Sequence, residues 1–256
     1  MSEVHSGLEG VVAFATEIAE PDREGGALRY RGVDLEELVG QVPFEQVWGL
    51  LVDGTLEPGL PPAEPHPLAV RSGDPRVDVQ SALAMLGPEW GFRALIDIED
   101  AEARDNLARA SVMALSFVAQ SARGTGRPPV PQSEVDKATS IPERFLIRWR
   151  GEADPAHVKA IDAYWNSAAE HGMNASTFTV RVVASTGADV AAALSAGVGA
   201  LSGPLHGGAP SRVLKMLDDV EREGDAERYV KALLDRGDRL MGFGHRVYRA
   251  EDPRAR

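Results

Sequence analysis

The chain of 256 residues contains no cysteine. This absence excludes disulfide bonds, thiolate nucleophiles and every cysteine-based zinc site. The first residues lack the basic and apolar regions of a secretory signal, and no apolar run has the length of a membrane helix. The chain also lacks the Gly-x-Ser-x-Gly elbow of serine hydrolases and the His-Glu-x-x-His pair of zinc peptidases. We therefore predict a globular, cytoplasmic protein without a membrane partner.

Positive charge is also scarce, since 27 lysines and arginines stand against 39 acidic residues and give a net charge of −12. This balance argues against nucleic acid or anionic lipid as a partner. The C-terminal segment 236–256 differs, because it holds six arginines against three acids. A locally basic segment on an acidic protein predicts a site for a small anionic ligand.

Most of the chain is predicted to be helical, so the predicted fold class is mainly α. A small β-hairpin is expected over residues 10–32, around a turn at 21–26. Beyond it, apolar residues recur at helical spacing, and the prolines of 58–67 mark a loop. The expected helices cover residues 35–42, 44–54, 77–86, 101–122, 188–203, 211–223 and 226–234, and two more begin near Ser140 and Pro155.

The segment 188–203 is unusually rich in small residues, with six alanines and three glycines. Small side chains let another helix approach closely, and a subunit interface is one use for such a surface. Its Gly197-Val198-Gly199 sequence is similar to a dinucleotide-binding fingerprint. No strand is predicted before it, so we interpret these glycines as structural.

Three histidines lie beside glycines or at the ends of predicted elements: His171, His206 and His245. Taken singly, each is more often a structural histidine than a catalytic one, by about two to one. His206 stands out because the surrounding GPLHGG sequence disfavours a helix, while a helix is expected from Ser211. Donors from that loop and helix N-terminus would keep the imidazole neutral, as a hydrogen-bond donor. A metal site made of the three histidines is a weak alternative, since their spacing does not enforce it.

His245 lies in the stretch GFGHRVYRAEDPR at 242–254. The two glycines before it permit backbone conformations that other residues avoid. Arg249 and Arg254 follow, and the planar guanidinium group matches carboxylates and phosphates. A histidine beside such arginines indicates an anionic substrate.

Three blocks of the sequence resemble the citrate synthase family: EHGMNAS at 170–176, GPLHGG at 203–208 and GFGHRVYRAEDPR at 242–254. They occur in the order of the family, and GLEGV at 7–11 and LRYRG at 28–32 are similar as well. The resemblance spans nearly the whole chain. It implies a mostly helical homodimer, without an N-terminal regulatory domain, that condenses oxaloacetate with acetyl-CoA and then hydrolyses citryl-CoA.

The resemblance also implies roles for single residues. His206 is expected to hydrogen-bond the thioester carbonyl and stabilise the enol, and His245 to polarise the ketone of oxaloacetate. His171 and Arg254 match positions that hold oxaloacetate carboxylates, and Arg249 matches one that contacts a coenzyme A phosphate. No metal and no permanently bound cofactor is implied, because the coenzyme A thioester is itself a substrate.

Compared with the family, the chain is expected to form a large helical domain over 1–210 and the start of a small domain over 211–256. The family's aspartate base, a further carboxylate-binding arginine and the closing helices would fall beyond Arg256. Asp252 is interpreted as structural, so a polypeptide of residues 1–256 alone is expected to be inactive. Pro210 stands where many members have asparagine, which could alter the coenzyme A loop.

Two alternatives remain open. The motifs do not separate citrate synthase from 2-methylcitrate synthase, which uses propionyl-CoA. The lack of a matching base also allows a noncatalytic dimeric scaffold. Asn174 and Ser176 belong to the first block, in a supporting role that the sequence does not specify, and neither does it define regulation.

Overall fold

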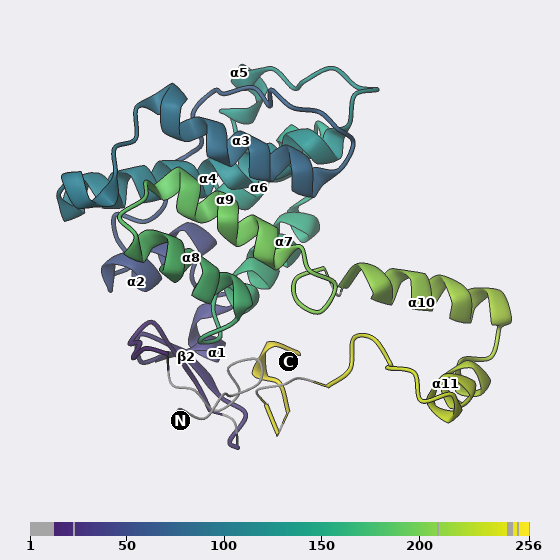
Figure 1. Cartoon of the computed structure of the whole chain (residues 1–256). Helices are drawn as coiled ribbons and strands as arrows, with labels where there is room; N and C mark the ends of the chain where they lie inside the picture. The colour runs from purple at the N-terminus through teal and green to yellow at the C-terminus, as the bar shows by residue number, and fades with distance from the viewer. Residues whose placement is uncertain (1–12, 23, 209, 245–247, 250, 256) are drawn as a thin grey trace.

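A computed structural model describes residues 13–22, 24–208, 210–244, 248–249 and 251–255 (Figure 1). The described part is mainly helical, as predicted, with one small sheet. The strands are β1 (Ala19–Pro21), β2 (Leu28–Tyr30) and β3 (Val33–Asp34). The helices are α1 (Leu35–Leu38), α2 (Phe44–Asp53), α3 (Pro75–Trp90), η2 (Leu95–Asp97), α4 (Asp100–Arg123), α5 (Gln132–Val135), α6 (Ile141–Arg150), α7 (Pro155–Ala168), α8 (Ala175–Ser185), α9 (Val190–Leu201), α10 (Pro210–Glu223), α11 (Ala226–Asp235) and η3 (Pro253–Ala255).

The sheet has three antiparallel strands in the order β1-β2-β3, rather than the single hairpin that the sequence predicted. Ala13 and Phe14, expected in its first strand, are not in a strand, and residues 10–12 lie outside the described residues. The turn was predicted correctly, and the Oδ1 atom of Asp22 accepts a hydrogen bond from the N–H of Gly25 at 2.8 Å. Tyr30, in the central strand, is fully buried.

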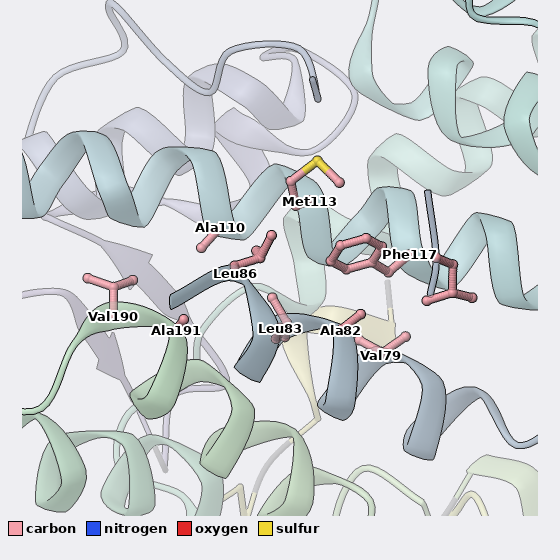
Figure 2. Packing of buried hydrophobic residues seen from close by; sticks show 10 residues of the cluster. Val79, Ala82, Leu83, Leu86, Ala110, Met113, Phe117, Val190 and Ala191 are labelled. Carbon is pink, nitrogen blue, oxygen red and sulfur yellow. The ribbon is translucent and has the colours of Figure 1, made fainter. Parts of the chain in front are cut away.

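The main core lies between α3, α4 and α9 (Figure 2). Leu86 of α3, Met113 and Phe117 of α4 and Ala191 of α9 meet there, and each is 0% exposed. Burying side chains of the size of the leucine, methionine and phenylalanine contributes about 1.5–3 kcal/mol each. This core fixes the helical body from which the neighbouring α8 and its loops are presented.

Helix α9 uses its small residues to let two neighbours approach, as the sequence predicted. A Cβ atom at Gly197 would lie 2.5 Å from a methyl carbon of Val180 in α8, and one at Gly199 would lie 2.9 Å from the Gln80 side chain in α3. Both glycines lie within the helix, so their structural interpretation is confirmed. Because these two glycines have no side chain, α8 and α3 can pack close to α9.

Two helices have other limits than those predicted. The first, expected over 35–42, is capped by Asp34 as predicted, but α1 ends at Leu38 because Val39 takes an extended conformation, and Gly40 follows with a φ of 73°. The second, expected over 77–86, extends from Pro75 to Trp90 as α3. The short α5 and the longer α8 were not predicted.

The last helices extend away from the body. In Figure 1, α10 and α11 project to one side, and the chain then returns to end near the sheet and α1. The apolar residues Leu214 and Leu217 of α10 are 66% and 53% exposed. No helix in the described ranges is both long and apolar enough to span a bilayer.

Candidate active site

Helix α8 begins at a cap that also positions the first block of candidate residues. Asn174 has extended backbone angles, and its Oδ1 atom accepts a hydrogen bond from the N–H of Thr177 at 3.0 Å. Asparagine is among the preferred residues at this position because it satisfies a free N–H of the first helical turn. The cap places His171 in the turn before the helix and Ser176 in its first turn.

The imidazole of His206 meets this helix start. His206 lies in the turn after α9, where its N–H donates to the carbonyl of Gly203 at 2.9 Å. Its Nε2 atom lies 2.8 Å from the Oγ atom of Ser176, which in turn lies 2.8 Å from Oδ1 of Asn174. The sequence predicted a helix N-terminus beside His206. The helix is α8, however, and not the one expected to begin at Ser211.

The contacts of the Nε2 atom fix the orientation of the imidazole. The main-chain N–H of Ser176 lies 3.4 Å from this atom, and the hydroxyl oxygen of Ser176 lies 2.8 Å from it. The one hydroxyl proton of Ser176 is donated to Oδ1 of Asn174, and which group donates between Ser176 and His206 depends on the tautomer of the ring. The Nδ1 atom, on the other edge of the ring, is not engaged by Ser176.

A buried tyrosine supports the turn that carries His171. The hydroxyl group of Tyr30 donates to the carbonyl of Asn166 at 2.9 Å and accepts from the N–H of Glu170 at 3.3 Å. The Oε1 atom of Glu170 in turn accepts the N–H of His171 at 2.8 Å. The sheet and the end of α7 thus hold the turn before α8 in place.

Burial changes the acidity of both groups. It raises the pKa of Tyr30 to about 12, although the hydrogen bond from Glu170 acts in the opposite direction. Burial also raises the pKa of the Glu170 carboxyl group, against hydrogen bonds from the N–H groups of His171 and Gly172. Arg181 also opposes this rise by its positive charge. An uncharged tyrosine and a carboxylate with raised pKa therefore lie beside the candidate histidine.

Arg254 interacts electrostatically with the same Tyr30. Its Nε and Nη2 atoms donate to the two carboxylate oxygens of Asp252, at 2.9 and 2.6 Å. Its guanidinium carbon lies 5.5 Å from the centre of the Tyr248 ring. Asp252 was predicted to be structural, and in the structure it holds the guanidinium group of Arg254. Asp252 also raises the pKa of Arg254, so this side chain remains a cation.

A cleft of about 500 Å³ opens beside Arg254. It lies between α1, α7 and the C-terminal η3, and it is lined by Leu35, Glu36, Val39, Ala163, Tyr164, Ser167, Pro253, Arg254 and Ala255. This volume is sufficient for a small dicarboxylate. The cation of Arg254 at its wall is the feature that favours an anionic occupant.

Arg249 and His245 are the two remaining candidates. Arg249 forms an ion pair with Glu24, with 3.1 Å between Nη1 and Oε1, and both side chains are largely exposed. Such surface pairs contribute about 0–1 kcal/mol, so Arg249 can exchange its partner at little cost. His245 lies outside the described residues.

The structure thus brings His206 together with Asn174 and Ser176, and it links Tyr30 to the His171 turn. Sequence reasoning had left the role of Ser176 open and had not proposed Tyr30 as part of the site. Two signals could have found them: a serine two residues after a capping asparagine, and a tyrosine on the buried face of a strand, whose hydroxyl needs a partner. Within the described ranges, no three histidine, aspartate or glutamate side chains are grouped to hold a metal ion.

Comparisons with known sequences agree in one family. A family model described as "Citrate synthase, C-terminal domain" matches residues 7–256. A Mycobacterium tuberculosis protein named "Putative citrate synthase 2" is 71% identical over 251 residues, which cover 98% of this chain and 67% of that protein. A "Citrate synthase" of Synechocystis sp. is 36% identical over 270 residues, which cover 97% of this chain and 66% of that protein. The chain thus spans about two thirds of the length of these relatives.

Solved structures agree with the sequences. The crystal structure of citrate synthase from Thermotoga maritima aligns with a TM-score of 0.73 at 28% identity, over 99% of this chain and 71% of that chain. The citrate synthase of Thermoplasma acidophilum, in a ternary complex with carboxymethyl coenzyme A and oxaloacetate, aligns with a TM-score of 0.83 at 25% identity. That alignment covers 100% of this chain and 71% of that chain.

Proposed function

Because this chain belongs to the citrate synthase family, we propose that the full-length protein condenses oxaloacetate with acetyl-CoA and releases citrate and CoA. The observation that carries the proposal is the hydrogen-bonded group of Asn174, Ser176 and His206, which orients the imidazole at the start of α8. A solved relative holds oxaloacetate and a coenzyme A analogue, which supports the same substrate classes here.

His206 would act on the thioester. The Nδ1 edge of the ring would donate a hydrogen bond to the thioester carbonyl oxygen, where negative charge grows as the methyl group loses a proton. Its Nε2 atom stays bound to Ser176, so the ring need not reorient during the step. The proton itself goes to a carboxylate base, which the family resemblance places beyond Arg256.

Arg254 and His171 would hold the carboxylates of oxaloacetate, and His245 would polarise its ketone for attack by the enol carbon. The guanidinium group of Arg254 already binds a carboxylate, that of Asp252, in a bidentate manner. A substrate carboxylate would share or replace this partner, with the same geometry. Water then hydrolyses the citryl thioester to citrate and free CoA.

Arg249 would contact a phosphate of coenzyme A. Its present partner Glu24 is exposed, and a phosphate offers more negative charge at the same kind of donor. The exchange therefore requires only the loss of a weak surface pair.

The proposal also covers the domains and the oligomeric state of the protein. We assign residues 1–210 to a large helical domain and residues 211–256 to the start of a small one, in keeping with the way that α10 and α11 leave the body (Figure 1). We further propose a cytoplasmic homodimer in which the small-residue helix α9 contributes to the subunit interface. A metal ion and a permanently bound cofactor are not required.

The test is an assay of the full-length protein with both thioesters. CoA release is measured with acetyl-CoA and with propionyl-CoA, in each case with and without oxaloacetate, and the product is identified by mass. We expect oxaloacetate-dependent release of CoA that His206→Ala abolishes and that His157→Ala, an exposed histidine on α7, leaves unchanged. A higher kcat/KM with propionyl-CoA would assign 2-methylcitrate synthesis. No release with either thioester would favour the noncatalytic scaffold.

A polypeptide limited to residues 1–256 should behave differently. One positioned general base contributes about 10²- to 10⁴-fold to a rate, so a polypeptide without it should form citrate very slowly. The exposed Leu214 and Leu217 of α10 should also make it prone to aggregate. Turnover close to that of the full-length protein, from a mass-verified 1–256 polypeptide, would show that the base lies within these residues.

A further inference from the structure

A second basic pocket lies where α4 and α6 end, and none of its residues belongs to the candidate active site. It is lined by four arginines, Arg71, Arg123, Arg127 and Arg148, together with Gln120, Gly124, Pro129 and Val130. The pocket has a cavity volume of about 30 Å³ and opens to solvent. This shape admits one or two oxygens of a larger group, whose remainder stays in the mouth.

Two of the arginines are fixed by neutral acceptors. Arg71 donates to the carbonyl of Gln120 at 3.2 Å. Arg123 donates to the carbonyls of Pro128 and Trp149 at 2.6 and 3.0 Å. These bonds hold the guanidinium groups in place without cancelling their charge.

The positive charges of the other two arginines, Arg148 and Arg127, are balanced even less by nearby groups. Arg148 is only 9% exposed, and its hydrogen bond goes to the amide oxygen of Gln132 at 3.1 Å. Burial and the neighbouring Arg144 lower the pKa of Arg148, although Asp136 opposes them. Arg127 is exposed and has no hydrogen-bond or ion-pair partner in the described part of the chain. A guanidinium group that is buried without an ion pair is costly unless a charge of opposite sign approaches it.

The charges of the pocket do not balance. Within the described ranges, no carboxylate lies within salt-bridge distance of any of the four arginines. The C-terminal ends of α4 and α6 each supply about −0.5 charge. The buried Asp78, which interacts electrostatically with Arg71, supplies one more negative charge, while Asp136 is already paired with Arg144 at 2.9 Å. About two positive charges remain.

We propose that this pocket binds a phosphoryl oxyanion, either free phosphate or the end of a phosphomonoester. Such a group carries close to two negative charges at neutral pH and has oxygens that match several guanidinium forks. Capping of helix ends explains Arg71 and Arg123. It does not explain why the buried Arg148 and the unpaired Arg127 line the same pocket, whereas an anion between them explains all four.

The test uses the full-length protein and compares inorganic phosphate, glycerol phosphate and chloride at equal ionic strength, by calorimetric titration and thermal unfolding. Phosphate should bind and raise Tm, whereas chloride should not. Arg127→Ala should weaken phosphate binding roughly tenfold, as expected for one charge-assisted contact. In chloride its Tm should stay the same or rise, because repulsion among the arginines is relieved. The matched control is Arg76→Ala, which removes an exposed arginine from the first turn of α3 outside the pocket.

Each outcome decides the proposal. Tighter binding of glycerol phosphate than of phosphate assigns the pocket to a phosphomonoester, and the reverse assigns it to the free ion. Equal effects of phosphate and chloride, or equal losses in Arg127→Ala and Arg76→Ala, overturn it. Arg148→Gln provides an independent check, since it keeps a hydrogen-bonding side chain inside the pocket but should likewise lose phosphate binding. These readouts do not depend on citrate formation.

Discussion

Replacement of Ser176 by alanine tests the arrangement around His206 most directly. The change removes a hydroxyl group that lies 2.8 Å from both Nε2 of His206 and Oδ1 of Asn174. The main-chain N–H of Ser176 remains, at 3.4 Å from Nε2. Alanine is also a better helix former than serine, so α8 should persist. The variant therefore keeps the imidazole of His206 but removes one of the contacts that hold it in place.

The size of the effect follows from the bond that is lost. A neutral hydrogen bond contributes about 0.5–1.5 kcal/mol net. If this energy holds the imidazole in its reactive orientation, its loss raises the barrier by the same amount and lowers kcat roughly 2- to 10-fold. The KM for oxaloacetate should hardly change, because His206 is assigned to the thioester.

The assay measures initial rates of CoA release by the full-length protein, at saturating oxaloacetate and varied acetyl-CoA. Ser185→Ala is the control, because the Ser185 hydroxyl lies in the same helix and donates to the carbonyl of Val182 at 2.7 Å. Ser176→Thr keeps a hydroxyl group and should recover most of the activity. Unchanged kcat in Ser176→Ala, or an equal loss in both alanine variants, would refute the positioning role.

Three further changes test other parts of the site. Tyr30→Phe should lower the free energy of unfolding by about 1–3 kcal/mol, because the buried Asn166 carbonyl and Glu170 N–H lose their partner; an unchanged urea midpoint would contradict this. Burial raises the pKa of Glu170, so the native state keeps its proton to higher pH than the unfolded chain, and stability falls as pH rises through that range. Glu170→Gln should remove this slope and raise Tm at neutral pH, as thermal unfolding across the range will show. Arg254→Lys keeps the charge but loses the two-pronged geometry, so the KM for oxaloacetate should rise, and an unaltered KM would argue against that assignment.

The fold was largely predictable because its helices carry strong local signals. Asp34, Ser140 and Asp154 each act as the N-cap that the sequence indicated, and α2 and α4 follow the apolar periodicity. The third strand and α8 were missed for a physical reason. A two-residue strand has no period to detect, and α8 has no buried residue, so its apolar pattern is weak.

The site was predictable only in part. The sequence singled out the blocks around His171 and His206 as candidates, since glycines and a capping asparagine mark irregular backbone. It could not show that Ser176 lies between Asn174 and His206, because that contact joins residues 30 positions apart. Nor could it show that Asp252 would occupy the guanidinium fork of Arg254.

These contacts give the two sides of the candidate site different degrees of preorganisation. On the proposed thioester side, Ser176 already holds the imidazole of His206 at the start of α8. On the proposed oxaloacetate side, Arg254 is bound to Asp252, so a substrate carboxylate would have to compete with a protein carboxylate. Competition of this kind lowers affinity but keeps the half-buried cation of Arg254 neutralised when no substrate is bound. We therefore expect changes on the thioester side to appear mainly in kcat, and changes around Arg254 mainly in the KM for oxaloacetate.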